Sequence, residues 1–475
     1  MAVSTSRRSL GLLRAAWLRR VAPAMATGSS WMNSAQHSCF TNIAITRRPF
    51  SDSSLGAPSA KHQSFCTGSD MAILAQALHF YGLTDDPSAM DASVVSGDRT
   101  DAMLWPGGQS MQLEQLNPVH RLIYSSIASA GCVIGIATPE VEAVARMPQG
   151  LQLMSQSGAH FYGCSVVSEN IATAALKLKE TEHLRLLILR DVGKAYVIGS
   201  SPGVAFTLAY YLQKVCHLQL LVGTRDVVSA DEEVWSHAAQ QTFIPDFSPG
   251  VEWPAVKAGV QRFFEARHLQ EMDKGCEAEE PSLRIALAKC HRELYKKGFD
   301  ELIWNHCSAL SGDSMLVTPG DCLWDDIMPA DFILDSKNVT ANILHSAIYD
   351  ATSAKAIVHT HAPGIEAVSC IKAGLIESSD SEFAGRVAYH SWQGISDDAD
   401  ECKVIGDVLM KNPDSIALIA QNHGAFTWGN SVDEALERHV ALEAACLGQL
   451  SKVRDTYGSA HMSSGQNFHF QQPQA

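Results

Sequence analysis

Three histidines in two short apolar contexts could together bind a metal ion. His359 and His361 are separated by one residue at the end of the apolar run 356–358. Side chains alternate between the two faces of an extended strand, so both imidazoles are expected to project the same way. His423 follows a second apolar run, 416–420, which a neighbouring strand could bring alongside the pair. Three imidazoles with an open coordination position are typical of a catalytic zinc site.

A His-x-His pair alone is a weak signal, because a histidine at a strand end is usually just a partly solvated polar residue. The surrounding sequence adds Asn305-His306, Leu316-Val317-Thr318-Pro319-Gly320, Leu344-His345-Ser346-Ala347-Ile348-Tyr349, Val387-Ala388-Tyr389-His390 and Asn422-His423-Gly424. In this order, these blocks resemble the class II aldolase/adducin family over about 283–453. They look more like the adducin head and its bacterial relatives than like the sugar-phosphate aldolases.

The resemblance implies a role for each matching position. His359, His361 and His423 match the three zinc-binding histidines of the family, whose metal polarises the substrate carbonyl and stabilises an enediolate. Tyr389 matches a tyrosine that acts as acid in the site of a neighbouring subunit. Further residues are implied to bind substrate: Asn305, Thr318 and Gly320 as part of a phosphate-binding loop, and Thr340 at one of two positions where aldolases have phosphate-holding serines.

The glutamate that serves as base in the aldolases of this family has no counterpart here. It stands four residues before the position of His345, where this chain has Ala341. Without a carboxylate, no evident group takes the proton from carbon. Adducin-like members also lack the glutamate, so its absence does not by itself abolish metal binding. Asp335 and Asp350 are alternative bases, although lone aspartates at such positions more often cap helices.

An earlier copy of the same pattern occupies the first half of the chain. The 475 residues, 46% of them hydrophobic, provide material for two sizeable cores. In matching order, the paired segments are His120-x-x-Ile123-Tyr124 with His345-x-x-Ile348-Tyr349, Glu142-Ala143-Val144 with Glu366-Ala367-Val368, and Leu187 to Gly193 with Leu418 to Gly424. We therefore predict two tandem class II aldolase/adducin-like layered α/β domains, at 71–224 and 283–455.

The first copy lacks the ligands that would bind zinc. The positions equivalent to the three histidines hold Ile134, Ile136 and Val192, or Gly135 and Ala137 in place of the two isoleucines if the pairing shifts by one residue. Aliphatic groups offer no donor atom, so we expect one zinc ion per chain, in the second repeat. The first repeat is expected to be a scaffold that docks against the second, as subunits dock in the family's ring-shaped tetramers.

Local signals predict several helices around these strands. Leucine and isoleucine at helical spacing predict a helix over 283–295, with Gly298 as its C-cap. Ser431 to Glu434 fits a capping box that starts a helix running to about Lys452. On that helix, His439 and Glu443 lie four residues apart and are interpreted as a surface pair.

Two further segments are predicted, a connector between the repeats and a C-terminal tail. Residues 225–282 contain Trp253-Pro254, a typical helix start, and are predicted to be a part-helical connector. Residues 456–475 are poor in apolar side chains and are predicted to be disordered. The long basic tail of the cytoskeletal adducins is absent from this sequence, so spectrin or actin binding does not follow from the resemblance.

The N-terminal composition predicts import into an organelle. The first 51 residues contain seven arginines and no lysine, aspartate or glutamate, which is typical of a mitochondrial or chloroplast transit peptide. Residues 48–53 resemble the two-step mitochondrial processing pattern, so we predict a leader over 1–57 and a mitochondrial matrix protein, with attachment to a membrane complex left open. A basic arm without a targeting role is the alternative.

Net charge and the length of apolar runs argue against nucleic acid and membranes as partners, and cysteine spacing predicts the redox state of the thiols. The chain carries a net −15, and without the first 51 residues it has 29 basic and 51 acidic side chains, a net −22. Such a surface repels nucleic acid and anionic membranes, and no apolar run approaches the 18 residues that span a bilayer. Twelve cysteines without a Cys-x-x-Cys pair predict reduced, mostly buried thiols.

Two functions from different classes fit these features. The first is a zinc-dependent lyase-like or isomerase-like enzyme of small hydroxylated carbonyl compounds, with Tyr389 as acid. The second is a pseudoenzyme: a non-catalytic structural subunit of a large mitochondrial assembly, built from a duplicated enzyme fold. The three retained histidines favour the enzyme, whereas the lost base and the lost first site favour the structural subunit. Either protein is expected to be a homo-oligomer or part of a larger complex.

Overall fold

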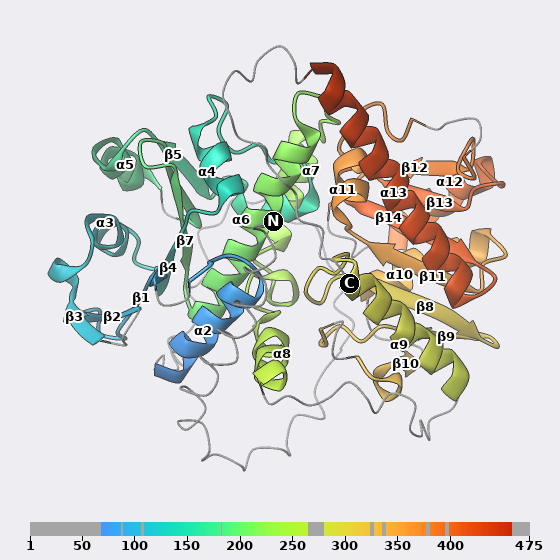
Figure 1. Ribbon diagram of the computed structural model, residues 1–475, viewed down its shortest axis with the longest axis horizontal. Helices are drawn as coiled ribbons and strands as arrows, with labels where there is room; N and C mark the ends of the chain where they lie inside the picture. The colour runs from blue at the N-terminus through green and yellow to red at the C-terminus, as the bar shows by residue number, and fades with distance from the viewer. Residues whose placement is uncertain are drawn as a thin grey trace, which may run out of the picture. The chain divides into compact units, whose positions relative to one another are not determined.

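The computed structural model describes residues 68–457, except for 87–88, 106–108, 182, 265–279, 324–326, 335–338, 377–380 and 395–398. These residues form two seven-stranded sheets flanked by helices (Figure 1). The predicted fold of two tandem layered α/β domains is confirmed. The predicted leader and the tail beyond residue 457 lie outside the described residues.

The first repeat is built from α2 (Gly68–Phe80), β1 (Asp91–Val95), β2 (Asp101–Trp105), β3 (Gln109–Gln112), α3 (Pro118–Ser126), β4 (Cys132–Ile136), α4 (Pro139–Arg146), β5 (Ser165–Ser168), α5 (Ile171–Lys177), β6 (Leu186–Leu189), β7 (Lys194–Gly199) and α6 (Pro202–Val222). A 3-10 helix, η4 (Gln156–Phe161), precedes β5. The strand order is β3-β2-β1-β4-β7-β6-β5.

The second repeat is built from α9 (Pro281–Lys296), β8 (His306–Ser311), β9 (Ser314–Val317), β10 (Ile333–Leu334), α10 (Val339–Ala351), β11 (Ala356–Thr360), α11 (Pro363–Ser369), β12 (Val387–His390), α12 (Ala399–Lys411), β13 (Ala417–Ala420), β14 (Gly424–Gly429) and α13 (Val432–Tyr457). Its strand order, β10-β9-β8-β11-β14-β13-β12, is the same as that of the first sheet. In each sheet the last pair, β5–β6 or β12–β13, is parallel and the other pairs are antiparallel.

Helices cover both faces of each sheet. Because successive side chains of a strand point to opposite faces, alternate strand residues contact different helices. In β11, Ala356 and Val358 pack with α9, α11 and α13, whereas Ile357 packs with α10 and α12. In β4, Ile134 packs with α4 and α6, and Val133 packs with α3 and α5. The central strands therefore read as continuous apolar runs rather than as an alternation of apolar and polar residues.

The predicted helix ends are found, with one change of partner. Gly298 follows α9 with a φ of +72°. Ser431 Oγ accepts a hydrogen bond from the backbone N–H of Glu434 at 3.1 Å. The Glu434 carboxylate, however, accepts from the backbone N–H of Asn430 at 2.7 Å rather than from that of Ser431.

The connector is part-helical, as predicted, and contains α7 (Glu232–Gln241) and α8 (Trp253–Phe264). The buried carboxylate of Glu252, just before α8, accepts hydrogen bonds from Thr207 Oγ1 at 3.1 Å in the first repeat and from Trp304 Nε1 at 2.8 Å near the second. The repeats also meet directly where α6 contacts α11. Among the described residues, no helix combines the length and apolar character needed to cross a bilayer.

Candidate metal centre

One end of the second sheet brings the three predicted histidines together. His359 lies in β11 and His361 directly after it, and both side chains are directed to the same region, as predicted. His423 lies in the turn between β13 and β14. The strand beside β11 is β14, not β13, so the apolar run before His423 is not the neighbour of the pair. The turn, rather than strand pairing, carries His423 across to the other two rings.

The geometry of the three rings fits a single cation. One nitrogen of each imidazole lies within 4.8 Å of the other two, and His359 Nε2 and His361 Nε2 are 3.0 Å apart. Tetrahedral zinc with Zn–N bonds of 2.0–2.1 Å would require nitrogens about 3.3 to 3.4 Å apart. The ring centroid of His423 is 5.1 Å from that of His359 and 4.6 Å from that of His361. Small side-chain adjustments would therefore suffice for coordination.

Hydrogen bonds on the far sides of two rings orient them for metal binding. His359 Nδ1 donates to the carbonyl oxygen of Ala425 at 3.0 Å. His361 Nδ1 donates to Glu301 Oε2 at 2.6 Å. In both rings this leaves the Nε2 lone pair directed to the shared region, an arrangement typical of metal-bound histidine.

Burial keeps the three imidazoles neutral, which is the form that binds metal. His359, His361 and His423 are 1%, 6% and 5% exposed. Burial, and then the nearby Lys214 ammonium, lower the pKa of His361 from 6.5 to about 3. Burial is also the main cause that holds the pKa values of His359 and His423 well below 6.5. No proton has to leave these rings at neutral pH before they coordinate.

The equivalent position in the first repeat is filled by an ion pair. In the sheet register, Gly135 pairs with Tyr196 as His359 pairs with Phe426, which selects the alignment with Gly135 and Ala137 over that with the isoleucines. Lys194 Nζ lies 2.5 Å from Asp91 Oδ2, and a Cβ atom added at Gly135 would lie 2.6 Å from that carboxylate oxygen and from Lys194 Cε. The ligands are absent and their space is occupied.

Comparison with known proteins agrees with this architecture. The model of the class II aldolase and adducin N-terminal domain matches residues 36–220 and 285–450. The chain belongs to the class II aldolase/adducin family. The first match begins inside the segment predicted as a leader, so the end of that leader at residue 57 stays a prediction.

Individual relatives cover only part of the chain. Alpha-adducin of Rattus norvegicus is 36% identical over 207 residues, which are 39% of this chain and 27% of the adducin. An adducin-related protein of Schizosaccharomyces pombe is 31% identical over 180 residues, 33% of this chain and 55% of that protein. The chain thus spans about a quarter and about half of their lengths. The crystal structure of an aldolase II superfamily protein from Pseudomonas syringae is 28% identical and covers 40% of this chain and 82% of its own, with a TM-score of 0.35.

A chain of polar side chains in contact with one another extends from His359 across the second sheet to α10. His306 lies opposite His359 in β8, and their ring centroids are 4.6 Å apart. His306 Nδ1 is 2.8 Å from His345 Nε2, and His345 Nδ1 is 2.6 Å from Ser308 Oγ, which in turn is 2.8 Å from Tyr349 OH. Sequence reasoning missed this cluster, although the alternation of His306 and Ser308 along one strand could have indicated that both side chains project to the same face.

Two of the predicted phosphate-binding residues have their polar atoms engaged inside the fold. Asn305 Oδ1 accepts from the backbone N–H of His361 at 3.2 Å, and its Nδ2 donates to Phe299 O at 2.7 Å. Thr318 Oγ1 is 2.7 Å from His291 Nε2 and accepts from the backbone N–H of Cys307 at 2.8 Å. Asn305 thus supports the backbone of His361, and phosphate binding by Asn305 or Thr318 stays a prediction that requires these bonds to be replaced.

The other predicted residues lie in varied surroundings. Gly320 is exposed in the turn after β9. Thr340 lies in the first turn of α10, among residues whose side chains are not described. Tyr389 OH accepts from the backbone N–H of Leu375 at 2.9 Å. Its predicted role concerns a neighbouring subunit and stays a prediction.

Of the two alternative bases, the one that the structure describes does not join the centre. Asp350 is exposed on α10, and Asp335 lies outside the described residues. The described cysteines are all free, as predicted, and burial raises the pKa values of Cys307 and Cys370 well above the usual range. Neither thiol is therefore a nucleophile at neutral pH.

The interpretation of His439 and Glu443 as a surface pair is wrong, because both side chains are buried. His439 Nε2 is 2.7 Å from Thr360 Oγ1, between the two histidines of β11. The Glu443 carboxylate accepts hydrogen bonds from the first backbone N–H groups of α11, those of Gly364 at 2.8 Å and Ile365 at 2.7 Å. The helix carrying both residues packs on the sheet, so their i,i+4 spacing marks an inward face.

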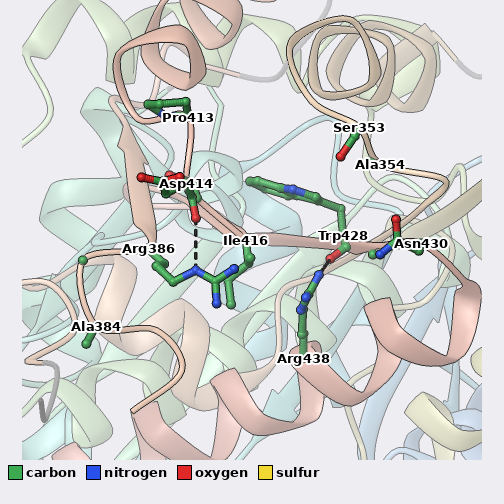
Figure 2. Close-up of a pocket in the computed structure, with 13 residues that line it drawn as sticks. Ser353, Ala354, Ala384, Arg386, Pro413, Asp414, Ile416, Trp428, Asn430 and Arg438 are labelled. Atoms are coloured by element: carbon green, nitrogen blue, oxygen red, sulfur yellow. Dashed lines mark hydrogen bonds between the residues drawn. The ribbon is translucent and has the colours of Figure 1, made fainter. Parts of the chain in front are cut away.

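A cavity of about 660 Å³ lies at the opposite end of the sheet from the histidines (Figure 2). It is bounded by Ala354, just before β11, and by Gly429, at the end of β14. Arg386 Nε donates to the carbonyl of Asp414 at 3.1 Å, and Arg438 donates to the carbonyl of Trp428. Both guanidinium groups are already hydrogen-bonded, and the cavity is remote from the three histidines. We therefore place the candidate site at the histidines and not at this cavity.

Proposed function

We propose that the second repeat binds one zinc ion through His359, His361 and His423, and that the protein is a metal-dependent lyase-like or isomerase-like enzyme of small hydroxylated carbonyl compounds. The observation that carries this proposal is the convergence of three buried imidazole nitrogens within 4.8 Å. Family membership supports the choice of zinc and of a carbonyl substrate.

The residues present suit the proposed chemistry. A zinc ion bound there would supply Lewis-acid polarisation of a carbonyl oxygen. Glu301 and the carbonyl of Ala425 hold the ligating rings in the required tautomer. Exposure of at most 6% at the three histidines favours a small substrate. Because Ala341 replaces the aldolase glutamate, proton abstraction by that position is excluded.

Metal content tests the site directly. We expect the purified full chain to contain about one zinc per molecule by elemental analysis, and His361→Ala to lose it because three donors become two. His291→Gln is the matched control: His291 is also buried and hydrogen-bonded, to Thr318 Oγ1 and Leu287 O, but does not face the cluster. A wild-type protein that remains metal-free after zinc loading contradicts the proposal.

Activity requires a separate measurement. Zinc-loaded protein incubated with dihydroxyacetone or glycolaldehyde in deuterium oxide should exchange carbon-bound hydrogen next to the carbonyl faster than His361→Ala does, as followed by proton NMR. Stoichiometric zinc with no exchange in any small hydroxycarbonyl compound would limit the function to metal binding.

The second candidate function is a structural subunit of a larger assembly. The loss of all ligands from the first repeat favours it, because one half of the duplicated fold keeps the architecture without the metal-binding side chains. Mitochondrial location is part of this proposal and is tested by import of the full chain into isolated mitochondria. Co-migration of the endogenous protein with a large complex on native gels supports the structural role, and migration as a small oligomer contradicts it.

A further inference from the structure

A lysine of the first repeat lies among acidic groups of the second. Lys214, on α6, forms an ion pair with Glu301 and another with Glu366, whose Oε2 lies 3.1 Å from Lys214 Nζ. The three side chains are 14%, 4% and 2% exposed. A buried ammonium is costly unless it is paired, and both of its partners belong to the other repeat.

The carboxylate of Glu301 contacts both Lys214 and one of the proposed metal ligands. Glu301 Oε2 accepts a hydrogen bond from His361 Nδ1 at 2.6 Å. Lys214 therefore fixes the carboxylate that in turn fixes the tautomer and ring orientation of His361. Such outer partners are known to change metal affinity without touching the metal.

A second route connects the first repeat to His423. Asn422, the residue before it, donates from Nδ2 to the carbonyl of Met154 at 2.7 Å. Its own carbonyl accepts from the backbone N–H of Gln156 at 2.8 Å. Both partners lie in the first repeat, at the start of η4. Two of the three zinc-binding histidines are thus held in place by groups outside their own repeat.

We propose that the first repeat, which has no metal ligands of its own, is the built-in outer shell of the centre in the second repeat, with Lys214 as its positioning residue. This inference rests on the proposed zinc site and assigns to the degenerate copy a role beyond that of an inert scaffold.

The test compares three full-length variants. Lys214→Met removes the ammonium, Lys214→Arg retains the charge, and Lys194→Met removes the first repeat's other ion-paired lysine, whose partner is Asp91 and not a residue of the second repeat. Zinc affinity is measured by competition with a chromophoric chelator. The visible absorption of the cobalt(II)-substituted protein reports the ligand geometry, which a purely structural contact would not alter.

We expect Lys214→Met to weaken zinc binding by about 10- to 100-fold, the range for outer-shell partners, and to alter the cobalt spectrum. Lys214→Arg should retain affinity and spectrum near those of the wild type, and Lys194→Met should leave both unchanged. If Lys214→Met does not fold because two buried carboxylates lose their partner, the double variant Lys214→Met with Glu366→Gln, which removes one of those charges, is judged by the same criteria.

Two results overturn the inference and differ in what else they overturn. Unchanged zinc affinity and cobalt spectrum in Lys214→Met, with a zinc-binding wild type, contradict the role of Lys214 and leave the zinc site intact. A wild type that takes up neither zinc nor cobalt contradicts the proposed function and this inference with it.

Discussion

His359 and Gly135 occupy the same position in the two sheets, one bearing an imidazole that faces two others and the other bearing no side chain. His359 pairs with Phe426 and with His306, and Gly135 pairs with Tyr196 and with Asp91. In the first repeat, Lys194 crosses this gap to reach Asp91. Where the second repeat has three converging imidazoles, the first repeat has a lysine ammonium paired with a carboxylate.

A first prediction concerns the polar cluster that both repeats retain. Ser93 Oγ is 3.0 Å from Tyr124 OH, as Ser308 Oγ is 2.8 Å from Tyr349 OH. Because the first repeat keeps this cluster without a metal, we expect Tyr349→Phe and Tyr124→Phe each to lower the free energy of unfolding by about 0.5–1.5 kcal/mol. Urea denaturation measures the cost. Loss of zinc in Tyr349→Phe, with normal stability, would assign the cluster to the metal centre instead.

A second prediction concerns the stability of the fold at acidic pH. Burial lowers the pKa of nine histidines in the described part of the chain: His160, His217, His291, His306, His345, His359, His361, His423 and His439. In the unfolded chain these rings protonate near pH 6.5, whereas in the fold they stay neutral to lower pH. The pKa falls to about 4 for His291 and to about 3 for His160, His345, His361 and His439. Stability is therefore present above pH 6.5 and lost as pH falls, by about 1.4 kcal/mol per pH unit for each ring.

Two buried carboxyl groups, Glu252 and Glu443, oppose this trend, because burial raises the pKa of each above 4.5. For Glu443 the pKa rises to about 7, so its protonated form favours folding between pH 4.5 and about pH 7. Nine rings outweigh two carboxyl groups, and the urea midpoint of the metal-free protein should fall between pH 7.5 and pH 5.5. A midpoint that is constant or rises over this range would show that the histidines are not held neutral by the fold.

The sequence was sufficient for the fold class and for the three histidines that converge at one end of the second sheet. Strand alternation places His359 and His361 on one side, and the duplicated blocks imply a second sheet of the same order. The strand that pairs with β11 on this side was harder to predict from sequence, because residues Gly424 to Gly429 directly follow a turn and carry glycine at both ends. Only pairing shows that β14 lies between β11 and β13.

The outer shell of the centre could not be predicted from sequence. Glu301 lies in a loop without a motif, and Lys214 belongs to a helix of the other repeat, so their meeting depends on packing between the repeats. The prediction for His439 and Glu443 was wrong for a different reason. Their i,i+4 spacing is equally typical of an exposed pair and of a buried helix face, and only the contacts with Thr360 and with α11 distinguish these cases.

A third prediction tests the carboxylate that caps α11. Glu443→Ala leaves the backbone N–H groups of Gly364 and Ile365 buried without their acceptor, which should cost about 1–3 kcal/mol of stability. Glu437→Ala is the matched control, because Glu437 is exposed on the same helix, and should change stability by less than about 0.5 kcal/mol. Equal urea midpoints for the two variants would contradict the capping role.

The last prediction separates the two contributions of Asn422. Its φ of +57° is costly for most residues but not for glycine, and its side chain donates to the carbonyls of Met154 and Val228. Asn422→Gly removes only these bonds, whereas Asn422→Ala removes them and adds backbone strain. We therefore expect both variants to weaken zinc binding, since the turn that carries His423 loses its anchor, and Asn422→Ala to be less stable than Asn422→Gly by about 1 kcal/mol. Zinc competition and urea denaturation on the same samples give the two quantities. If Asn422→Gly binds zinc as tightly as the wild type, the side-chain bonds of Asn422 do not hold His423 in place, and the backbone hydrogen bond from Gln156 to the Asn422 carbonyl is the contact with the first repeat that remains at this turn.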